Sequence, residues 1–219
     1  MARGLLVSSA VAALLAAIVP AQSAGTSAGA SSAAPPDKVT VDVVTVNGSG
    51  CRAGTAAVAT SPDNTAFTVT YSDYLATAGG ASSPTAFRKN CQLSLLVNVP
   101  HGFTYAITSA DYRGFASLQP GVTAVEKASY YFQGSSSTNS RTHTFTGPMS
   151  EDWQATDTTD WAQLVWAPCG AQRSVNVNTE LRVQLGASDR SKTSFMTMDS
   201  TDGSVNTIYH LAWKQCPAT

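Results

Sequence analysis

The dominant pattern along the chain is an alternation of apolar and polar residues. In residues 174–185 (SVNVNTELRVQL), valine, threonine and leucine occupy every second position, with serine, asparagine, glutamate, arginine and glutamine between them. Successive side chains of a β-strand point to opposite faces of its sheet, so this pattern predicts an antiparallel strand with one buried and one solvated face. Helical periodicity is nearly absent elsewhere, and the sequence therefore favours an all-β fold.

The same alternation predicts about ten strands, separated by turn sequences such as Asn47-Gly48 and Pro120-Gly121. We expect them at residues 39–46, 67–71, 92–99, 103–107, 122–132, 141–145, 161–166, 174–185, 194–198 and 207–213. Many short strands with one apolar face each are typical of an antiparallel β-sandwich, here jelly-roll-like. A closed β-barrel is the alternative that the number of strands leaves open.

The N-terminus indicates export. A short cationic start (Met1 to Arg3) precedes an apolar run from Leu5 to Val19, and small residues follow as far as Ala24. This order is typical of a secretory signal peptide, here residues 1–24. The low-complexity stretch 25–37 is expected to be a linker, and residues 38–219 a single domain. We expect a secreted, extracellular protein with no membrane attachment after signal cleavage, because the apolar run is shorter than a bilayer span and no later one is longer.

Export determines how the four cysteines are interpreted. The chain has an even number of cysteines, namely Cys51, Cys91, Cys169 and Cys216. An exported protein reaches an oxidising compartment, so two disulfides are expected. Three connectivities are possible. We favour Cys51 with Cys91 and Cys169 with Cys216, because each pair links segments within one half of the chain.

Composition excludes several classes of protein. Only 12% of the 219 residues are charged and the formal net charge is -1. A coiled coil or a charged helical bundle needs more charge, and nucleic-acid binding needs clustered lysine and arginine. The sequence therefore indicates a low-charge globular domain without a nucleic-acid partner.

Several longer phrases resemble a known family. They include VTVDVVTVNGSGCRAGTAAVATSPDNTAFTVTYSDY, FRKNCQLSLLVNVPHGFTYAI, DYRGFASL, YYFQG, NTELRV and MDSTDG, which occur in order from Lys38 to Cys216. Together they are similar to a secreted family of actinobacteria and filamentous fungi classified as a domain of unknown function. The resemblance implies an extracellular location, paired cysteines and a β-rich fold. It carries over no activity and no catalytic residue.

No sequence motif for catalysis stands out. Residues 38–219 contain no G-x-S-x-G nucleophile elbow and no H-E-x-x-H zinc motif, and His101, His143 and His210 are isolated from one another. Asp111 is expected to form a local charge pair with Arg113. We therefore predict no catalytic residue, no metal site and no cofactor.

The richest binding chemistry lies in EDWQATDTTDW, residues 151–161, which has no strong strand or helix period. An indole can cover the apolar face of a sugar while carboxylates accept hydrogen bonds from its hydroxyls. The alternative is that Trp161 begins a strand and points into the core while Trp153 covers a loop. The candidate ligand-binding residues are Trp153, Trp161, Glu151, Asp152, Asp157 and Asp160.

Three functional hypotheses follow. The first is a non-catalytic extracellular module that binds a polysaccharide or a cell-wall glycan, based on the β-rich fold, the low charge and residues 151–161. The second is an extracellular hydrolase whose carboxylates meet in space. The third is a structural surface protein without a small ligand.

Overall fold

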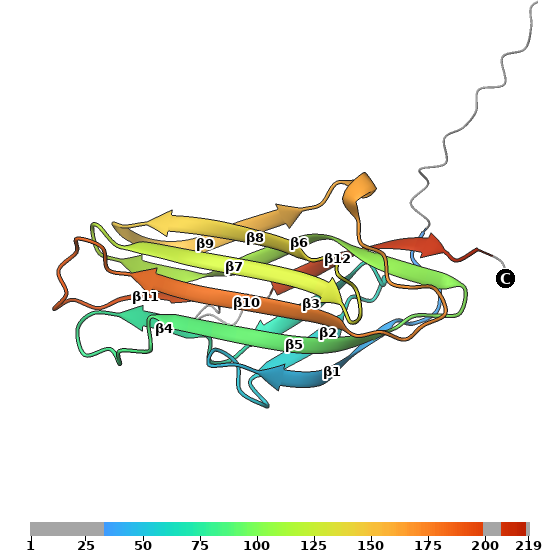
Figure 1. Ribbon diagram of the computed structural model, residues 1–219, viewed down its shortest axis with the longest axis horizontal. Helices are drawn as coiled ribbons and strands as arrows, with labels where there is room; N and C mark the ends of the chain where they lie inside the picture. Colours follow the sequence, from blue (N-terminus) through green and yellow to red (C-terminus); the bar gives the residue numbers. More distant parts are fainter. Residues whose placement is uncertain (1–32, 199–206, 218–219) are drawn as a thin grey trace, which may run out of the picture. The chain divides into compact units, whose positions relative to one another are not determined.

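The computed structural model describes residues 33–198 and 207–217. It contains twelve β-strands and one short 3-10 helix (Figure 1). The predicted signal peptide (residues 1–24) and most of the predicted linker lie outside the described residues. In the described part of the chain, no helix is long and apolar enough to cross a membrane.

Two antiparallel sheets form the domain. The five-stranded sheet has the order β1 (Thr40–Asn47), β5 (Arg88–Asn98), β10 (Val175–Gln184), β7 (Thr123–Phe132) and β8 (Asn139–Thr146). The seven-stranded sheet contains, in order, β2 (Ala56–Thr60), β3 (Ala66–Tyr71), β12 (Thr207–Gln215), β6 (Phe103–Leu118), β11 (Ser194–Thr197) and β4 (Leu75–Ala78). Its seventh strand, β9 (Met149–Thr158), pairs with β6.

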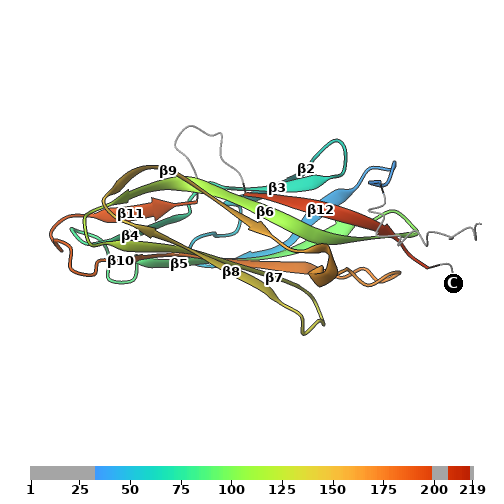
Figure 2. The same ribbon diagram turned by 90° about the horizontal axis from the view of Figure 1, so that it is seen from above.

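The sheets pack face to face, as Figure 2 shows with β6 and β12 in one layer and β5 and β10 in the other. The apolar side of each alternating strand lies in this interface. Leu95 and Val177 of the five-stranded sheet and Phe67 and Tyr209 of the seven-stranded sheet are at most 1% exposed. The predicted β-sandwich is confirmed, and the sheets do not close into a barrel.

The largest differences from the predicted strands concern residues 149–166. The strand expected at residues 161–166 is instead a 3-10 helix, η1 (Trp161–Gln163), followed by a single bridge between Trp166 and Ala106. The strand β9 was not predicted, and neither were β2 and β4. Alanine and threonine dominate β2 and β4, so these strands lack the large apolar residues that reveal alternation.

Both favoured disulfides are present, Cys51–Cys91 with a Cα–Cα distance of 5.2 Å and Cys169–Cys216 with one of 5.8 Å. The first attaches the connection between β1 and β2 to β5. The second attaches the loop before β10 to the residue that follows β12.

The ordered domain includes residues before Lys38. The side-chain amide of Asn64 donates to the carbonyl oxygens of Pro35 (3.0 Å) and Asp37 (2.8 Å), and its oxygen accepts from the backbone N–H of Val39. The Trp213 indole in turn donates to the Asn64 carbonyl at 2.8 Å. One asparagine therefore fastens the end of the predicted linker to β12.

Removing one disulfide should destabilise the domain without changing its fold. Cys51→Ser/Cys91→Ser opens a loop with a sequence separation of 40 residues, and the lost constraint on the unfolded chain should lower the free energy of unfolding by about 4 kcal/mol. Urea unfolding followed by tryptophan fluorescence measures this change. An unchanged urea midpoint would contradict the prediction.

Candidate functional site

Residues 151–161 form no single binding surface. Most of the segment belongs to β9, which pairs with β6 and alternates between buried and exposed positions. Trp153, Ala155 and Asp157 point inward, whereas Asp152 is exposed. The expectation of an irregular segment is corrected: pairing with β6 makes it a regular strand, so its neighbouring side chains point to opposite faces.

The two candidate tryptophans occupy different environments. Trp153 is 3% exposed, its ring centroid lies 5.1 Å from that of Phe145, and its indole N–H donates to the Thr197 carbonyl at 3.0 Å. Trp161 is 43% exposed, and its ring packs edge-on against Trp166 at 5.3 Å. Trp153 is therefore a core residue, and a sugar can reach only Trp161.

The four candidate acids are also dispersed. Glu151 and Asp152 are exposed on β9, and Asp160 is exposed just before η1. Asp157 is buried, and its Oδ1 lies 2.8 Å from the Nε2 of His143 on β8. A ligand-binding role for the exposed members of this set stays a prediction.

A second histidine–aspartate pair lies on the other side of the seven-stranded sheet. The Nε2 of His210 is 2.8 Å from Oδ2 of Asp111, and the Thr156 hydroxyl donates to Oδ1 at 2.6 Å. Burial acts to raise the pKa of Asp111, but these hydrogen bonds outweigh it and hold the pKa below its usual value. The aspartate lies between the hydroxyl and the imidazole, so the histidine is not placed to activate Thr156 as a nucleophile.

The outer face of the five-stranded sheet carries a continuous line of uncharged polar side chains. Five residues that are direct partners in the strand registers cross the whole sheet, and we call them the amide–hydroxyl row. They are Asn47, Gln92, Asn178, Ser129 and Ser140. Direct partners share a face, so all five side chains project from the same side, about 4.8 Å apart from strand to strand.

The neighbouring rows on this face are polar as well. On one side lie Asn90, Glu180, Lys127 and Thr142, and on the other Thr45, Ser94, Asn176 and Tyr131. A shallow pocket of about 490 Å³ opens here, with Gln92, Asn178 and Ser129 of the row in its wall. Phe87, the residue before β5, lines the same pocket and is 43% exposed.

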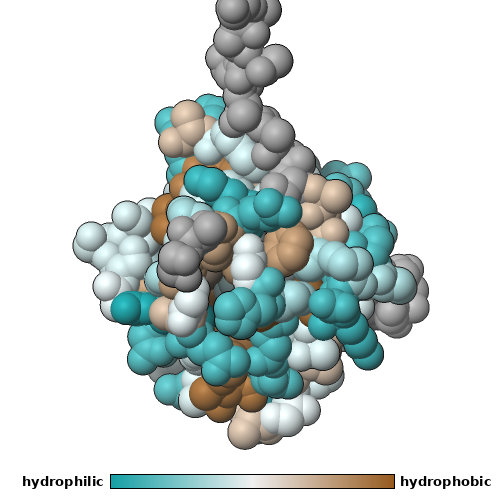
Figure 3. Space-filling model, turned by 90° about the vertical axis from the view of Figure 1, so that its right-hand side faces the viewer, coloured by the Kyte–Doolittle hydropathy of each residue, from teal (hydrophilic) through white to brown (hydrophobic). Residues whose placement is uncertain are grey.

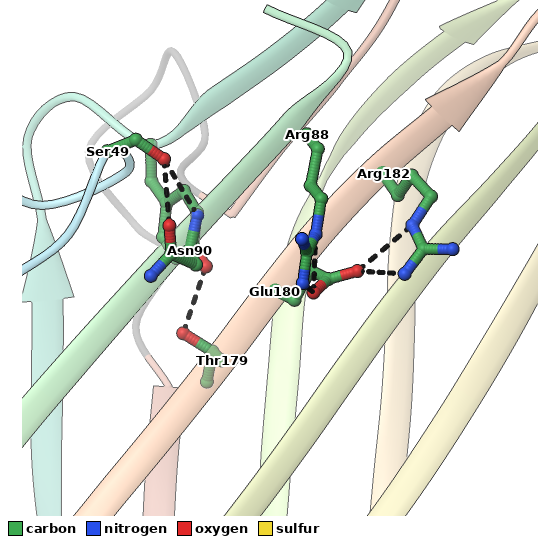
Figure 4. Close-up of polar contacts among 7 residues, drawn as sticks. Ser49, Arg88, Asn90, Thr179, Glu180 and Arg182 are labelled. Atoms are coloured by element: carbon green, nitrogen blue, oxygen red, sulfur yellow. Dashed lines mark hydrogen bonds and ion pairs between the residues drawn. The ribbon is translucent and has the colours of Figure 1, made fainter. Parts of the chain in front are cut away.

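Hydrogen bonds hold the charged side chains of this face in place (Figure 4). The Nε of Arg88 donates to Glu180 at 2.8 Å, and the Nε of Arg182 donates to the other carboxylate oxygen at 3.0 Å. Partial burial acts to raise the pKa of Glu180, but both guanidiniums outweigh it and keep the pKa below its usual value. Ser49 donates to the Asn90 side chain at 2.9 Å. Glu180 is therefore ionised, and each of its carboxylate oxygens accepts a hydrogen bond from an arginine.

Sequence reasoning found the polar side of β10 but not this surface. Each strand taken alone shows only that alternate residues are solvated. The row appears when the register places Gln92 and Asn178 side by side, although 86 positions separate them in the sequence. Strand register is a property of the paired strands, so no local signal reveals it.

Sequence reasoning also missed an acid in the core. Glu126 on β7 is 0% exposed, and none of the described residues hydrogen-bonds to either carboxyl oxygen. Burial raises the pKa of Glu126 to about 9, and the charge of Asp157 adds to the shift. The buried phenols that interact with it electrostatically belong to Tyr71, Tyr74, Tyr112 and Tyr209. Glu126 is therefore neutral at pH 7 and inaccessible to a substrate.

The buried carboxyl predicts an unusual dependence of stability on pH. Between an ordinary pKa of 4.5 in the unfolded chain and about 9 in the folded one, the folded state binds the extra proton. The free energy of unfolding should therefore fall as pH rises through this range, by up to about 1.4 kcal/mol per pH unit. Urea unfolding at pH 5, 6, 7 and 8 measures the slope.

Glu126→Gln should remove this slope, because an amide of similar size has no proton to lose. Glu151→Gln, at an exposed position of β9, is the matched control and should leave the slope unchanged. Equal slopes for the wild type and Glu126→Gln would show that Glu126 is already ionised in the folded protein.

Comparisons with known proteins identify a family. A family model described as a domain of unknown function, DUF4360, matches residues 37–216. An uncharacterized secreted protein of Arthroderma benhamiae is 39% identical over 181 residues, which cover 83% of this chain and 73% of the relative. The secreted relative and the two disulfides indicate an extracellular protein. The chain belongs to the DUF4360 family.

Proposed function

We propose that this protein is a non-catalytic extracellular module that binds polysaccharide through the outer face of its five-stranded sheet. The observation that carries the proposal is the amide–hydroxyl row, which places a hydrogen-bonding side chain on each of five neighbouring strands. The side-chain amides of Gln92 and Asn178 make no hydrogen bond to any other described residue. Their donors and acceptors are therefore available to a ligand.

The row suits a long ligand with repeated hydroxyl groups. A saccharide chain lying across the strands would meet a polar side chain about every 4.8 Å. Amide groups both donate and accept hydrogen bonds, as sugar hydroxyls do. The exposed ring of Phe87 at the edge of the pocket offers an apolar surface to the carbon face of a sugar ring.

Rigidity favours binding at this surface. The backbones of Gln92, Asn178 and Ser129 are held on the three inner strands of the sheet, and the opposite face of that sheet packs into the core. Side chains on such a support lose less freedom on binding than side chains on a loop. This advantage is absent at Trp161, which lies in a short 3-10 helix.

The charges of the pocket argue against the hydrolase hypothesis. Carboxylate-dependent glycoside hydrolysis needs two acids that face one another across the substrate. Glu180 is the one carboxylate among the described residues that line this pocket, and two arginines hold it. Lys127 lies beside it without an ion-pair partner among residues 33–198 and 207–217, so the pocket suits neutral or acidic sugars.

A glycan array and co-sedimentation with insoluble cell-wall polysaccharides test the proposal. The wild type should bind at least one neutral or acidic polysaccharide. Gln92→Ala/Asn178→Ala should lower the affinity about tenfold or more, because it removes two amides from the centre of the row.

The control is Ser150→Ala/Gln154→Ala, which removes two exposed polar side chains from β9 of the other sheet. It should bind as the wild type does. No retention of the wild type on any polysaccharide, or equal losses in the two variants, would refute the proposal. The first outcome would favour a structural surface protein.

A further inference from the structure

A second pocket, of about 500 Å³, lies at one end of the sandwich. It is bounded by the connection between β5 and β6, the loop before β10 and the end of β12 (Figure 1). The disulfide Cys169–Cys216 forms part of its wall. Figure 3 faces this end of the domain and shows hydrophobic side chains exposed among hydrophilic ones. The pocket shares no described lining residue with the pocket on the sheet face.

The inner wall of this end pocket is part of the core. Val97 and Tyr105 line it and are 4% and 2% exposed, and Val99 and Phe103 pack against the same core cluster. The pocket therefore reaches into the space between the two sheets. Its volume and apolar wall match those of pockets that enclose small organic molecules.

The rim of the end pocket carries the positive charge of Arg173. No acidic residue is among the described residues of its lining. Nη1 of Arg173 donates to the Gln133 carbonyl at 3.0 Å, which fixes the guanidinium and leaves other N–H groups available to a ligand.

From these features we infer that the end pocket binds a small amphipathic carboxylic acid. The carboxylate binds Arg173, and the hydrocarbon part packs against Val97, Val99 and Phe103. This inference does not depend on polysaccharide binding, because it concerns other residues at another part of the domain.

Displacement of the fluorescent probe 8-anilinonaphthalene-1-sulfonate tests the inference, with circular dichroism to verify that each variant is folded. Two competitors are compared: dodecanoic acid and its methyl ester. The wild type should bind the acid about fivefold more tightly than the ester, because the ester lacks the negative charge that pairs with Arg173.

One variant tests the charged contact. Arg173→Gln should bind the acid and its methyl ester equally, whereas Arg113→Gln, at an exposed arginine of β6, should retain the preference for the acid. Failure of both competitors to displace the probe, or an Arg173→Gln variant that still prefers the acid, would overturn the inference.

Discussion

The packing of the two sheets through their apolar faces is the interaction on which the other features depend. Each strand has one face to bury, and neither sheet alone can shield it from water. Tyr71, Tyr112 and Tyr209 from one sheet meet Leu95 and Val177 from the other, all at most 2% exposed. The buried apolar side chains of the inner faces stabilise the fold. The side chains of the outer faces can therefore be polar and contact solvent or a ligand.

This division of roles explains the low charge of the protein. Serine, threonine and asparagine on the outer face of the five-stranded sheet are solvated without attracting counterions, and such side chains can both donate and accept hydrogen bonds. Among the described residues that line the pocket on this face, Glu180 is the one carboxylate, and Arg88 and Arg182 both donate hydrogen bonds to it. The other unusual acid, Glu126, is buried without such a partner and is held neutral by its surroundings.

Local pattern was enough to predict the sandwich and most strands with large alternating residues, and sequence proximity was enough for the disulfides. It failed at residues 161–166, which begin with a 3-10 helix, and in β9. Trp153, Ala155 and Asp157 alternate in β9, but the buried aspartate and the acids around it concealed the period. The strand β7 was predicted, but the burial of its charged residue type Glu126 was not. The amide–hydroxyl row and the end pocket were beyond sequence reasoning, because both arise from contacts between distant strands.

The position of β12 has a consequence for biogenesis. This strand is the last in the chain, yet it lies between β3 and β6 in its sheet. The hydrogen bonds of that sheet cannot be completed until the ribosome has made residues 207–215. The edges of β3 and β6 that face β12 therefore stay unpaired until then, and pairing between such distant segments makes folding slow.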